Sequence, residues 1–261
     1  VAGDRLTVAA LLPLGAEPHS YEPTPSDLTK VAKSTVLIVN GAGLEEFLEE
    51  TLQNVGGRRM VIEASAGLQP RDRKAGEHSD GDHEHKEGDP HFWLDPISVI
   101  HYVENIRDGL SKADPAGAST YAANAEAYIE KLKALDIWIR EEVKKVPEKN
   151  RLLVTNHESL GYFADRYGFT VVGTILQSVT ASASPTAQEL AHLADVIKLT
   201  GAKSIFLETG TNPQLARQLA QEAGITVAPG LYSHSLTDGP PAPTYIEMMK
   251  YNVTTIVNAL R

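Results

Sequence analysis

DPAGASTYAANAEAYIEKLKALDIWIREEVKKVP, residues 114–147, is the most regular part of the sequence. Its apolar side chains recur at steps of three or four residues, which is the spacing of one helical face. Asp114 and Pro115 can begin this helix, and Pro147 must end it because proline blocks helical continuation. About 30 residues at ~1.5 Å each predict a rod roughly 45 Å long, enough to join two small domains stiffly. The apolar positions are Tyr121, Ala125, Tyr128, Leu132, Leu135, Ile139, Val143 and Val146.

On both sides of this helix, apolar β-branched runs alternate with helical patterns, which is typical of parallel βα units. We therefore predict an α/β fold of two parallel-sheet lobes, residues 1–113 and 148–261, joined by one long rigid helix at 114–147. The expected strands are Leu6–Leu12, Thr35–Val39 and Arg59–Ile62 in the first lobe, and Leu152–Thr155, Thr170–Ile175, Ser204–Leu207 and Ile225–Ala228 in the second. The helices expected in the first lobe are Pro25–Lys33, Leu44–Asn54 and Pro96–Lys112.

The composition is that of an ordinary globular protein. With 261 residues, 42% of them hydrophobic, the chain can bury one large core or two modest ones. The net charge of −10 argues against nucleic acid or an anionic membrane surface as partner and favours a cation. No apolar run approaches the ~20 residues that cross a bilayer. Because the sequence has no cysteine, any metal site must use nitrogen and oxygen ligands.

A second unusual stretch follows the third expected strand. Residues 77–91 read EHSDGDHEHKEGDPH, and from residue 69 to residue 89 there is no hydrophobic periodicity. Such a stretch predicts a mobile surface loop. Its histidines, His78, His83 and His85, are candidates for accessory metal binding, since histidine-rich tracts bind metal weakly and without fixed geometry. The alternative is a solvated polar insert.

Four other histidines follow expected strands. His19 and His91 follow strands of the first lobe, and His157 and His234 follow strands of the second. Ligands of parallel α/β sheets bind at the carboxyl ends of the strands, so these four side chains predict a metal site in the cleft between the lobes. Taken singly, a histidine beside a strand is more often a hydrogen-bonded structural residue than a ligand.

Imidazole ligands favour zinc, whereas a manganese or magnesium site would contain more carboxylate and water. A cation held by residues of both lobes would also bias an equilibrium between open and closed forms toward the closed form. The other two histidines, His101 and His192, lie inside helical patterns and predict surface or helix-packing roles.

Several motifs, in order along the chain, resemble the zinc and manganese substrate-binding proteins of ABC transporters, known as the cluster A-I metal-binding proteins. They are GAEPHSYEPTPSD around His19, DPHFWLDP around His91, TNHESLGYFADRYG around His157, FLETG at residues 206–210 and YIEMMKYN near the end. The resemblance covers nearly the whole chain. It implies two α/β lobes joined by a long helix, with a metal ion held between them and delivered to a membrane permease.

The resemblance also implies a location and a ligand set. The protein is expected to be periplasmic, or to be held at the outer face of the cell membrane as a lipoprotein, and to act as a monomer that carries Zn²⁺ to a zinc ABC permease. His19, His91 and His157 match three ligand positions of the family. Manganese members usually have glutamate where His157 stands, so the chain resembles the zinc branch. The histidine-rich loop is similar to an insert typical of zinc binders.

Two features depart from the family pattern. The fourth ligand is usually an aspartate, but the matching stretch LYSHSL places His234 there; the alternatives are water, Asp238 or Glu208. Glu208 is also a candidate to accept the second N–H of a ligand histidine. The family further implies a strand and a helix before the segment VAGDRLTV at residues 1–8, so we expect the sequence to be truncated.

Other classes of function have weaker support. A histidine-rich zinc site with an open position can activate water, which makes a zinc-dependent hydrolase one alternative. The sequence has no HExxH, no GxSxG and no phosphate-binding glycine loop, so we predict a protein that is not an enzyme. A manganese-binding member of the same family and an adhesin are the remaining alternatives.

Overall fold

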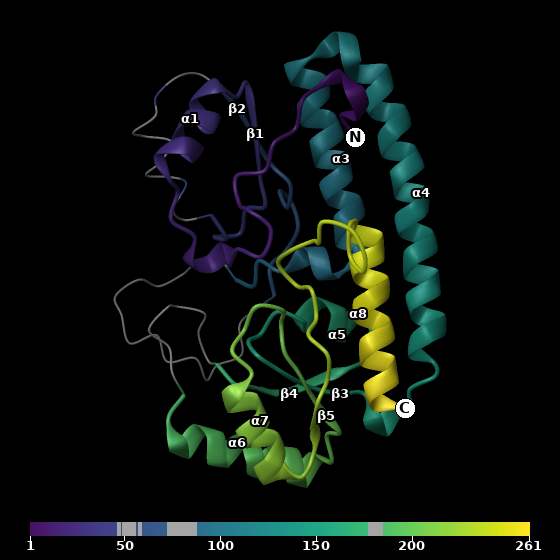
Figure 1. Ribbon diagram of the computed structural model, residues 1–261. Helices are drawn as coiled ribbons and strands as arrows, with labels where there is room; N and C mark the ends of the chain where they lie inside the picture. The colour runs from purple at the N-terminus through teal and green to yellow at the C-terminus, as the bar shows by residue number, and fades with distance from the viewer. Residues whose placement is uncertain (46–47, 49–55, 57–58, 72–87, 177–184) are drawn as a thin grey trace. The chain divides into compact units, whose positions relative to one another are not determined.

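The computed structural model of the protein describes residues 1–45, 48, 56, 59–71, 88–176 and 185–261. The chain divides into two compact units, and the division falls inside helix α4 (Ala118–Val143), between Asp136 and Ile137. We call the described residues up to Asp136 the first unit and Ile137–Arg261 the second unit. Figure 1 shows the elements of each unit, which are described separately below.

Helix α4 confirms the strongest expectation from the sequence. It extends over 26 residues, about 39 Å at ~1.5 Å per residue. A single 3₁₀ turn at Pro115–Gly117 precedes it, and it ends at Val143, a few residues before Pro147. The predicted apolar face is buried at every position except Tyr128, which is half-buried.

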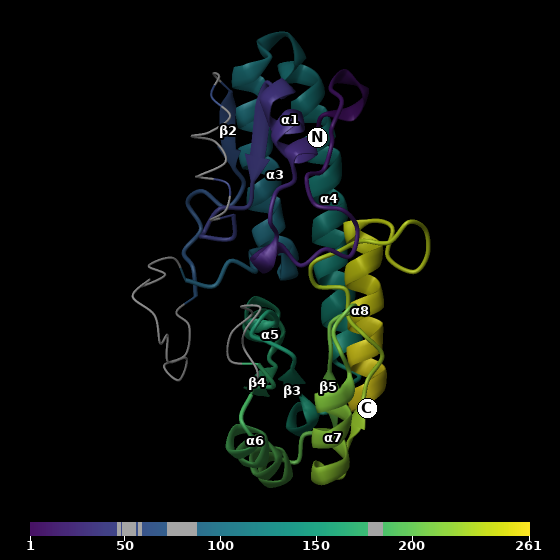
Figure 2. The same ribbon diagram turned by 60° about the vertical axis from the view of Figure 1, so that its left-hand side comes forward.

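The first unit contains a two-stranded parallel sheet with a long helix against it. Strand β1 (Val36–Val39) pairs with β2 (Met60–Glu63), and α1 (Pro25–Lys33) precedes β1. Helix α3 (Pro96–Ala113) packs beside both strands, as Figure 2 shows. The approach is close, since a Cβ added at Gly109 would lie 2.5 Å from the side chain of Ile62.

One predicted strand of this unit is wrong. Leu6–Leu12 has no strand structure, and its residues 7–10 are exposed. In the described part of this unit only β1 and β2 pair with each other, and Leu6–Leu12 adds to neither edge of their sheet. The helix predicted at Leu44–Asn54 lies mostly outside the described residues.

The second unit contains a four-stranded parallel sheet in the order β4-β3-β5-β6. Its strands are β3 (Leu152–Thr155), β4 (Thr170–Thr174), β5 (Ser204–Phe206) and β6 (Thr226–Val227). Its helices are α5 (Gly161–Tyr167), α6 (Ala187–Thr200), α7 (Gln214–Ala223) and α8 (Tyr245–Leu260). Figure 1 shows α6 and α7 below the sheet and α5 and α8 on its other side. All four strands were predicted, the last three of them one to two residues longer than observed.

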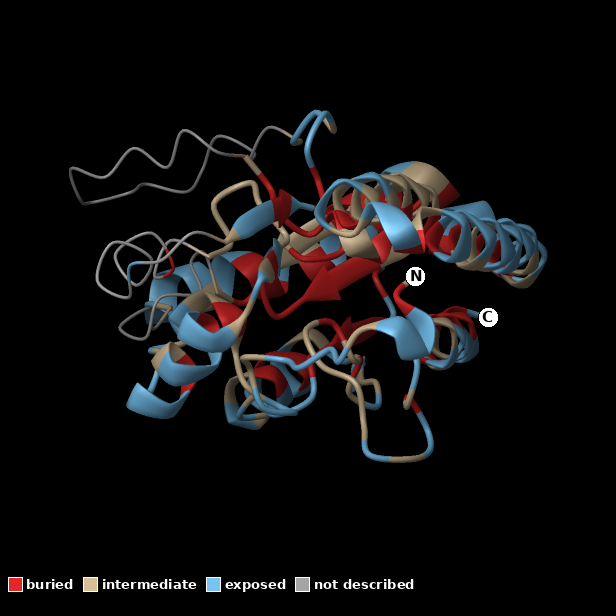
Figure 3. Ribbon diagram, turned by 90° about the horizontal axis from the view of Figure 1, so that it is seen from above, coloured by how far each residue is buried: buried red, intermediate tan, exposed pale blue. Residues whose placement is uncertain are grey.

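Burial follows the amphipathic patterns of these elements. The core between the second sheet and its lower helices includes Val154, Ile197, Ile205 and Leu219. Strands β3 and β5 are mostly buried, and Figure 3 shows exposed residues on the outer faces of the helices. Among the described residues, no helix combines the length and the apolar character needed to cross a membrane.

The core of the second unit provides a stability test on a single helix. Ile197 is fully buried on α6, whereas Leu199, two residues later, is 88% exposed. We expect Ile197→Ala to lower the free energy of unfolding by about 2–5 kcal/mol, because it removes buried methyl groups and leaves a cavity. Leu199→Ala is the control and should change it by less than about 0.5 kcal/mol. Urea denaturation of the metal-free variants measures both, and equal effects would contradict the assigned faces of α6.

Candidate metal-binding site

His91 lies shortly after the histidine-rich stretch, in the part of the chain that the structure describes again from residue 88. Arg71 and Asp89 form an isolated antiparallel bridge at the base of the loop. One 3₁₀ turn, Phe92–Leu94, follows His91. Asp95 then caps α3 by accepting a hydrogen bond from the backbone N–H of Ile97 at 2.9 Å. The backbone on both sides of His91 is therefore held.

The ring of His91 is oriented by Asp89. Nδ1 of His91 lies 2.7 Å from Oδ1 of Asp89, and the same oxygen accepts the backbone N–H of His91 at 3.0 Å. Both side chains are buried, and Oδ2 of Asp89 lies 3.4 Å from the guanidinium of Arg71. A carboxylate only accepts hydrogen bonds, so the proton of a neutral His91 ring stands on Nδ1. Nε2 is left with a lone pair for a metal ion.

His19 faces Nε2 of His91. It lies in a 3₁₀ turn, Pro18–Ser20, whose backbone is held by Glu17 through a 3.2 Å hydrogen bond to the N–H of His19. The Nε2 atoms of His19 and His91 are 3.0 Å apart. Because Asp89 assigns the proton of His91 to Nδ1, His19 must donate from Nε2 in this pair.

A metal ion can take the place of the proton shared by these two rings. With zinc–nitrogen bonds of about 2.0–2.1 Å at a tetrahedral angle, two ligand nitrogens lie about 3.3–3.4 Å apart. The observed 3.0 Å separation of the Nε2 atoms is a few tenths of an ångström shorter. Small rotations of the two side chains would admit the ion, and the proton of His19 would stand on its Nδ1, so that the ring stays neutral.

The second unit contains another pair of histidines, arranged around one carboxylate. His157 follows β3, and its backbone carbonyl accepts the hydroxyl of Thr155 at 2.8 Å. Glu208 follows β5 and forms a parallel bridge with Leu231, which brings His234, three residues later, to the same sheet edge. The rings of His157 and His234 stack, with centroids 5.1 Å apart and planes 20° apart.

Each carboxylate oxygen of Glu208 faces one of these rings. Oε1 lies 3.1 Å from Nδ1 of His157, and Oε2 lies 3.5 Å from Nδ1 of His234. Oε1 also accepts the hydroxyl of Ser159 at 2.8 Å. Burial by itself raises the pKa of Glu208, but the hydrogen bond from His157, the charges of both rings and the Ser159 hydroxyl outweigh it and hold this pKa below its ordinary value. A carboxylate at this place again favours protons on Nδ1 and lone pairs on Nε2.

The four predicted histidines therefore form two pairs, one in each unit. The remaining predicted residues stand differently: Asp238 is exposed, and His78, His83 and His85 lie outside the described residues. His101 binds the carbonyl of Ala66 from α3, and His192 is exposed on α6, as expected of packing and surface residues. Sequence reasoning missed Asp89 and Ser159. A carboxylate two residues before a candidate ligand was the available signal for Asp89.

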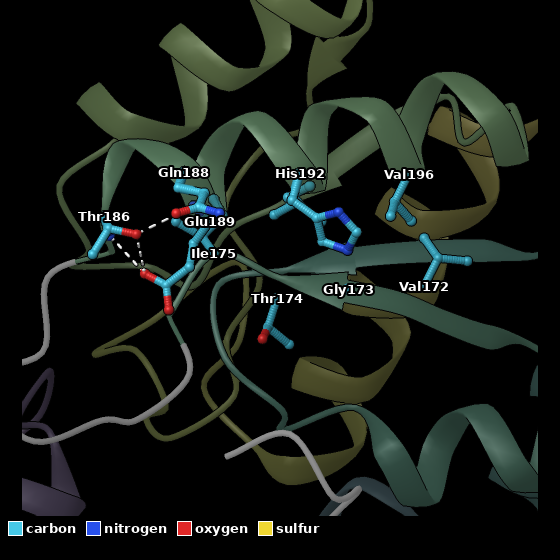
Figure 4. Close-up of a pocket in the computed structure, with 10 residues that line it drawn as sticks. Val172, Gly173, Thr174, Ile175, Thr186, Gln188, Glu189, His192 and Val196 are labelled. Atoms are coloured by element: carbon cyan, nitrogen blue, oxygen red, sulfur yellow. Dashed lines mark hydrogen bonds between the residues drawn. The ribbon is translucent and has the colours of Figure 1, made fainter. Parts of the chain in front are cut away.

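A pocket of about 550 Å³ lies elsewhere in the second unit, between β4 and α6. Figure 4 shows His192, Glu189 and Thr174 at its lining, and Glu189 binds Thr186 in the capping box of α6. None of the four paired histidines lines this pocket. The pocket is therefore separate from the candidate metal ligands.

The comparison with known proteins is decisive at the family level. Residues 1–259 match the family model of the periplasmic component A of the zinc-uptake complex. The chain belongs to this family. All of it aligns with 83% of the manganese-binding lipoprotein MntA of Halalkalibacterium halodurans at 38% identity. At 33% identity, 98% of it aligns with 52% of the zinc-binding lipoprotein AdcA of Streptococcus pneumoniae serotype 4.

Solved structures give the same result. A manganese-bound periplasmic metal-binding protein from Candidatus Liberibacter asiaticus superposes with a TM-score of 0.84 at 30% identity, over 100% of this chain and 93% of that one. The expected fold class, two parallel-sheet α/β lobes with a long connecting helix, is thereby confirmed.

Membership of the zinc-uptake component A family confirms the coarse function. The protein is a metal-binding substrate-binding protein of an ABC transporter and works with a membrane permease. Members of the family are solute-binding proteins and not enzymes, and they act outside the cytoplasm, in the periplasm or at the outer face of the membrane.

The arrangement around Glu208 predicts the protonation of both rings. In metal-free protein at pH about 8, where imidazole is neutral, ¹⁵N NMR should show His157 and His234 protonated at Nδ1. Glu208→Gln should move one ring to the Nε2-protonated form, because an amide has one acceptor oxygen and its NH₂ must face an unprotonated nitrogen. Glu222→Gln, an exposed site on α7, is the control and should change neither ring. Two unchanged Nδ1–H signals in Glu208→Gln would contradict this geometry.

Proposed function

We propose that the protein captures Zn²⁺ with high affinity and that its four ligands are His19, His91, His157 and His234. The observation that carries the proposal is that a carboxylate oxygen faces the Nδ1 atom of three of these rings. Asp89 accepts from Nδ1 of His91, and the carboxylate oxygens of Glu208 lie 3.1 and 3.5 Å from Nδ1 of His157 and His234, which favours protons on Nδ1 and presents Nε2 for coordination. Each unit supplies two nitrogens, and a tetrahedral zinc ion takes four, so one ion is matched by the two pairs together.

Zinc is favoured over manganese by the chemistry of the donors. Neutral imidazole suits zinc, whereas manganese prefers carboxylate, carbonyl and water oxygen. Four neutral imidazoles leave the two charges of the ion uncompensated among its ligands. Asp89 and Glu208 each place one buried negative charge behind the ligand rings. These two carboxylates, which are not ligands themselves, balance the two positive charges of the ion.

Manganese is the second candidate, because the relative at 38% identity is named a manganese-binding lipoprotein. A manganese site would need more oxygen donors than the two histidine pairs provide. Glu208 or Asp238 could provide one in place of His234. Glu208 already faces two imidazoles and a hydroxyl, and this arrangement supports an orienting role for it.

The same proposal extends to delivery. We infer that a monomer with lobes 1–113 and 148–261, linked by the helix at 114–147, carries zinc to the permease of a zinc ABC importer. The two pairs of nitrogens bind the ion fully only when both lobes contribute. Opening the lobes would therefore remove half of the coordination shell and release the ion to the permease.

Isothermal titration calorimetry with chelator competition tests the cargo and its ligands. We expect zinc to bind more tightly than manganese. Alanine at each of the four histidines should weaken zinc binding by more than about 100-fold, beyond the 10- to 100-fold loss typical of an outer-shell partner. His192→Ala, at an exposed site on α6, is the matched control and should bind zinc as the native protein does.

The titration also separates the alternatives. Tighter binding of manganese, or zinc binding unaffected by His19→Ala, His91→Ala and His157→Ala, would overturn the assignment. A loss on Asp238→Ala together with no loss on His234→Ala would make Asp238 the fourth ligand.

We also propose that His78, His83 and His85 collect zinc weakly as an accessory. Because Arg71 and Asp89 are paired, the residues between them can be removed and the ends joined by a short turn. In the deletion variant Gly-Gly replaces residues 72–87 and forms a three-residue turn with Gly88. We expect this variant to keep one tight zinc site, because Asp89 and His91 are retained, and to lose additional weaker binding in the same calorimetric titration.

A native loop in which all three histidines are replaced by serine is the second arm of this test. It should match the deletion. If either variant loses the tight site, the loop belongs to the main site. If both retain all the weaker binding, the accessory role is wrong.

A further inference from the structure

We propose that Asn40 is a positioning residue for metal capture, acting through the peptide group that joins Pro90 to His91. This inference rests on the proposed function, because it takes His91 to be a ligand. Asn40 lies just after β1, 50 residues before Pro90 in the sequence, and its side chain joins β1 to the segment that carries His91. No motif in the sequence pointed to this residue.

The side chain of Asn40 is held in one orientation. Its Nδ2 donates to the carbonyl of Pro90 at 3.1 Å and to the carbonyl of Gly41 at 2.9 Å. Its Oδ1 accepts the hydroxyl of Tyr102, which lies on α3. Carbonyl oxygens accept only, so the NH₂ group must face Pro90 and the oxygen must face Tyr102.

The backbone of Asn40 is also held. Its N–H donates to Oε1 of Glu45 at 2.7 Å, and the N–H of Gly41 donates to Oε2 of Glu45 at 3.1 Å. Its carbonyl accepts from Ser65, which follows β2, at 3.0 Å. Asn40 is therefore a rigid point at the end of the sheet, from which a hydrogen bond to another segment can set position.

The bond from Asn40 fixes one end of the peptide group before His91. The carbonyl of Pro90 and the N–H of His91 belong to the same planar unit. Asn40 holds the carbonyl at 3.1 Å together with the backbone N–H of Phe92 at 2.9 Å, while Asp89 holds the N–H of His91 at 3.0 Å. With both ends held, rotation of this plane is blocked. The Cα of His91, and hence its Nε2, is placed before the metal arrives, which lowers the ordering cost of binding.

Asn40→Asp tests this role with almost no change in size. The carboxylate still accepts from Tyr102 but places an oxygen against the carbonyl of Pro90, so the bond becomes a repulsion. We expect zinc affinity to fall about 10- to 100-fold, the range for groups that orient a ligand. The visible spectrum of Co²⁺ bound at the site, which reports coordination geometry, should change as well.

Asn105→Asp is the matched control. Asn105 is on α3 and donates through Nδ2 to the carbonyls of Ala64 and Ala66 at 2.8 and 3.0 Å, so it loses the same kind of bond in the same unit. The hydrogen bonds of Asn105 join α3 to the segment after β2 and do not reach the segment that carries His91. Its zinc affinity and Co²⁺ spectrum should match those of the native protein, although the free energy of unfolding falls.

Tyr102→Phe supplies a second readout. It removes only the hydroxyl that orients Asn40, so it should weaken zinc binding less than Asn40→Asp. In a double-mutant cycle the two losses should be less than additive. Equal zinc affinities of Asn40→Asp and Asn105→Asp, with unchanged Co²⁺ spectra, would overturn the inference.

His91→Ala in the same series separates the two proposals. If His91→Ala abolishes tight binding and Asn40→Asp does not weaken it, only the positioning role fails. If His91→Ala has no effect, the proposed ligand set itself fails.

Discussion

A neutral imidazole binds a metal ion only through a ring nitrogen that carries no proton. The hydrogen bond from Nδ1 to Asp89 imposes this condition on His91, and the carboxylate of Glu208, 3.1 and 3.5 Å from the Nδ1 atoms of His157 and His234, favours it on both of those rings. Without those carboxylates, each ring could rotate or change tautomer and present an N–H to the ion. The rest of each unit places these carboxylates and keeps them buried, where their hydrogen bonds are strong.

The secondary structure explains how side chains far apart in sequence reach these places. In the second unit, β3 and β5 are neighbours in a parallel sheet, so the residues that follow them, His157 and Glu208, emerge at one edge. In the first unit, the cap of α3 at Asp95 and the bridge between Arg71 and Asp89 hold His91 from both sides. The backbone is ordered by the fold, so little entropy remains to be lost when an ion binds.

The ligands of the candidate site differ in charge from those of a site built of carboxylates. In the site that we propose, the four imidazole ligands are neutral, and the negative charges of Asp89 and Glu208 would stand behind the ligand rings and not on the ion itself. This favours a borderline metal such as zinc over a hard one such as manganese, since the direct bonds are to nitrogen. The family contains proteins named for either metal, so the donor set is the physical basis for the choice within it.

The sequence by itself determined the elements whose pattern is local and repeated. The spacing of apolar residues along α4 and the four strands of the second unit depend on neighbours within a few residues. The four candidate histidines could also be selected from the sequence, because each follows an apolar run. Leu6–Leu12 shows the limit, since an apolar run becomes a strand only when another strand offers it hydrogen bonds.

Only the tertiary structure decided which group accepts from each ring. Glu208 is 51 residues from His157, and Asn40 is 50 residues from Pro90, so no local pattern links them. Hydrogen bonds act over about 3 Å and depend on direction. Partners of this kind are therefore defined by the packing of sheets and helices, which the order of residues specifies only through the completed fold.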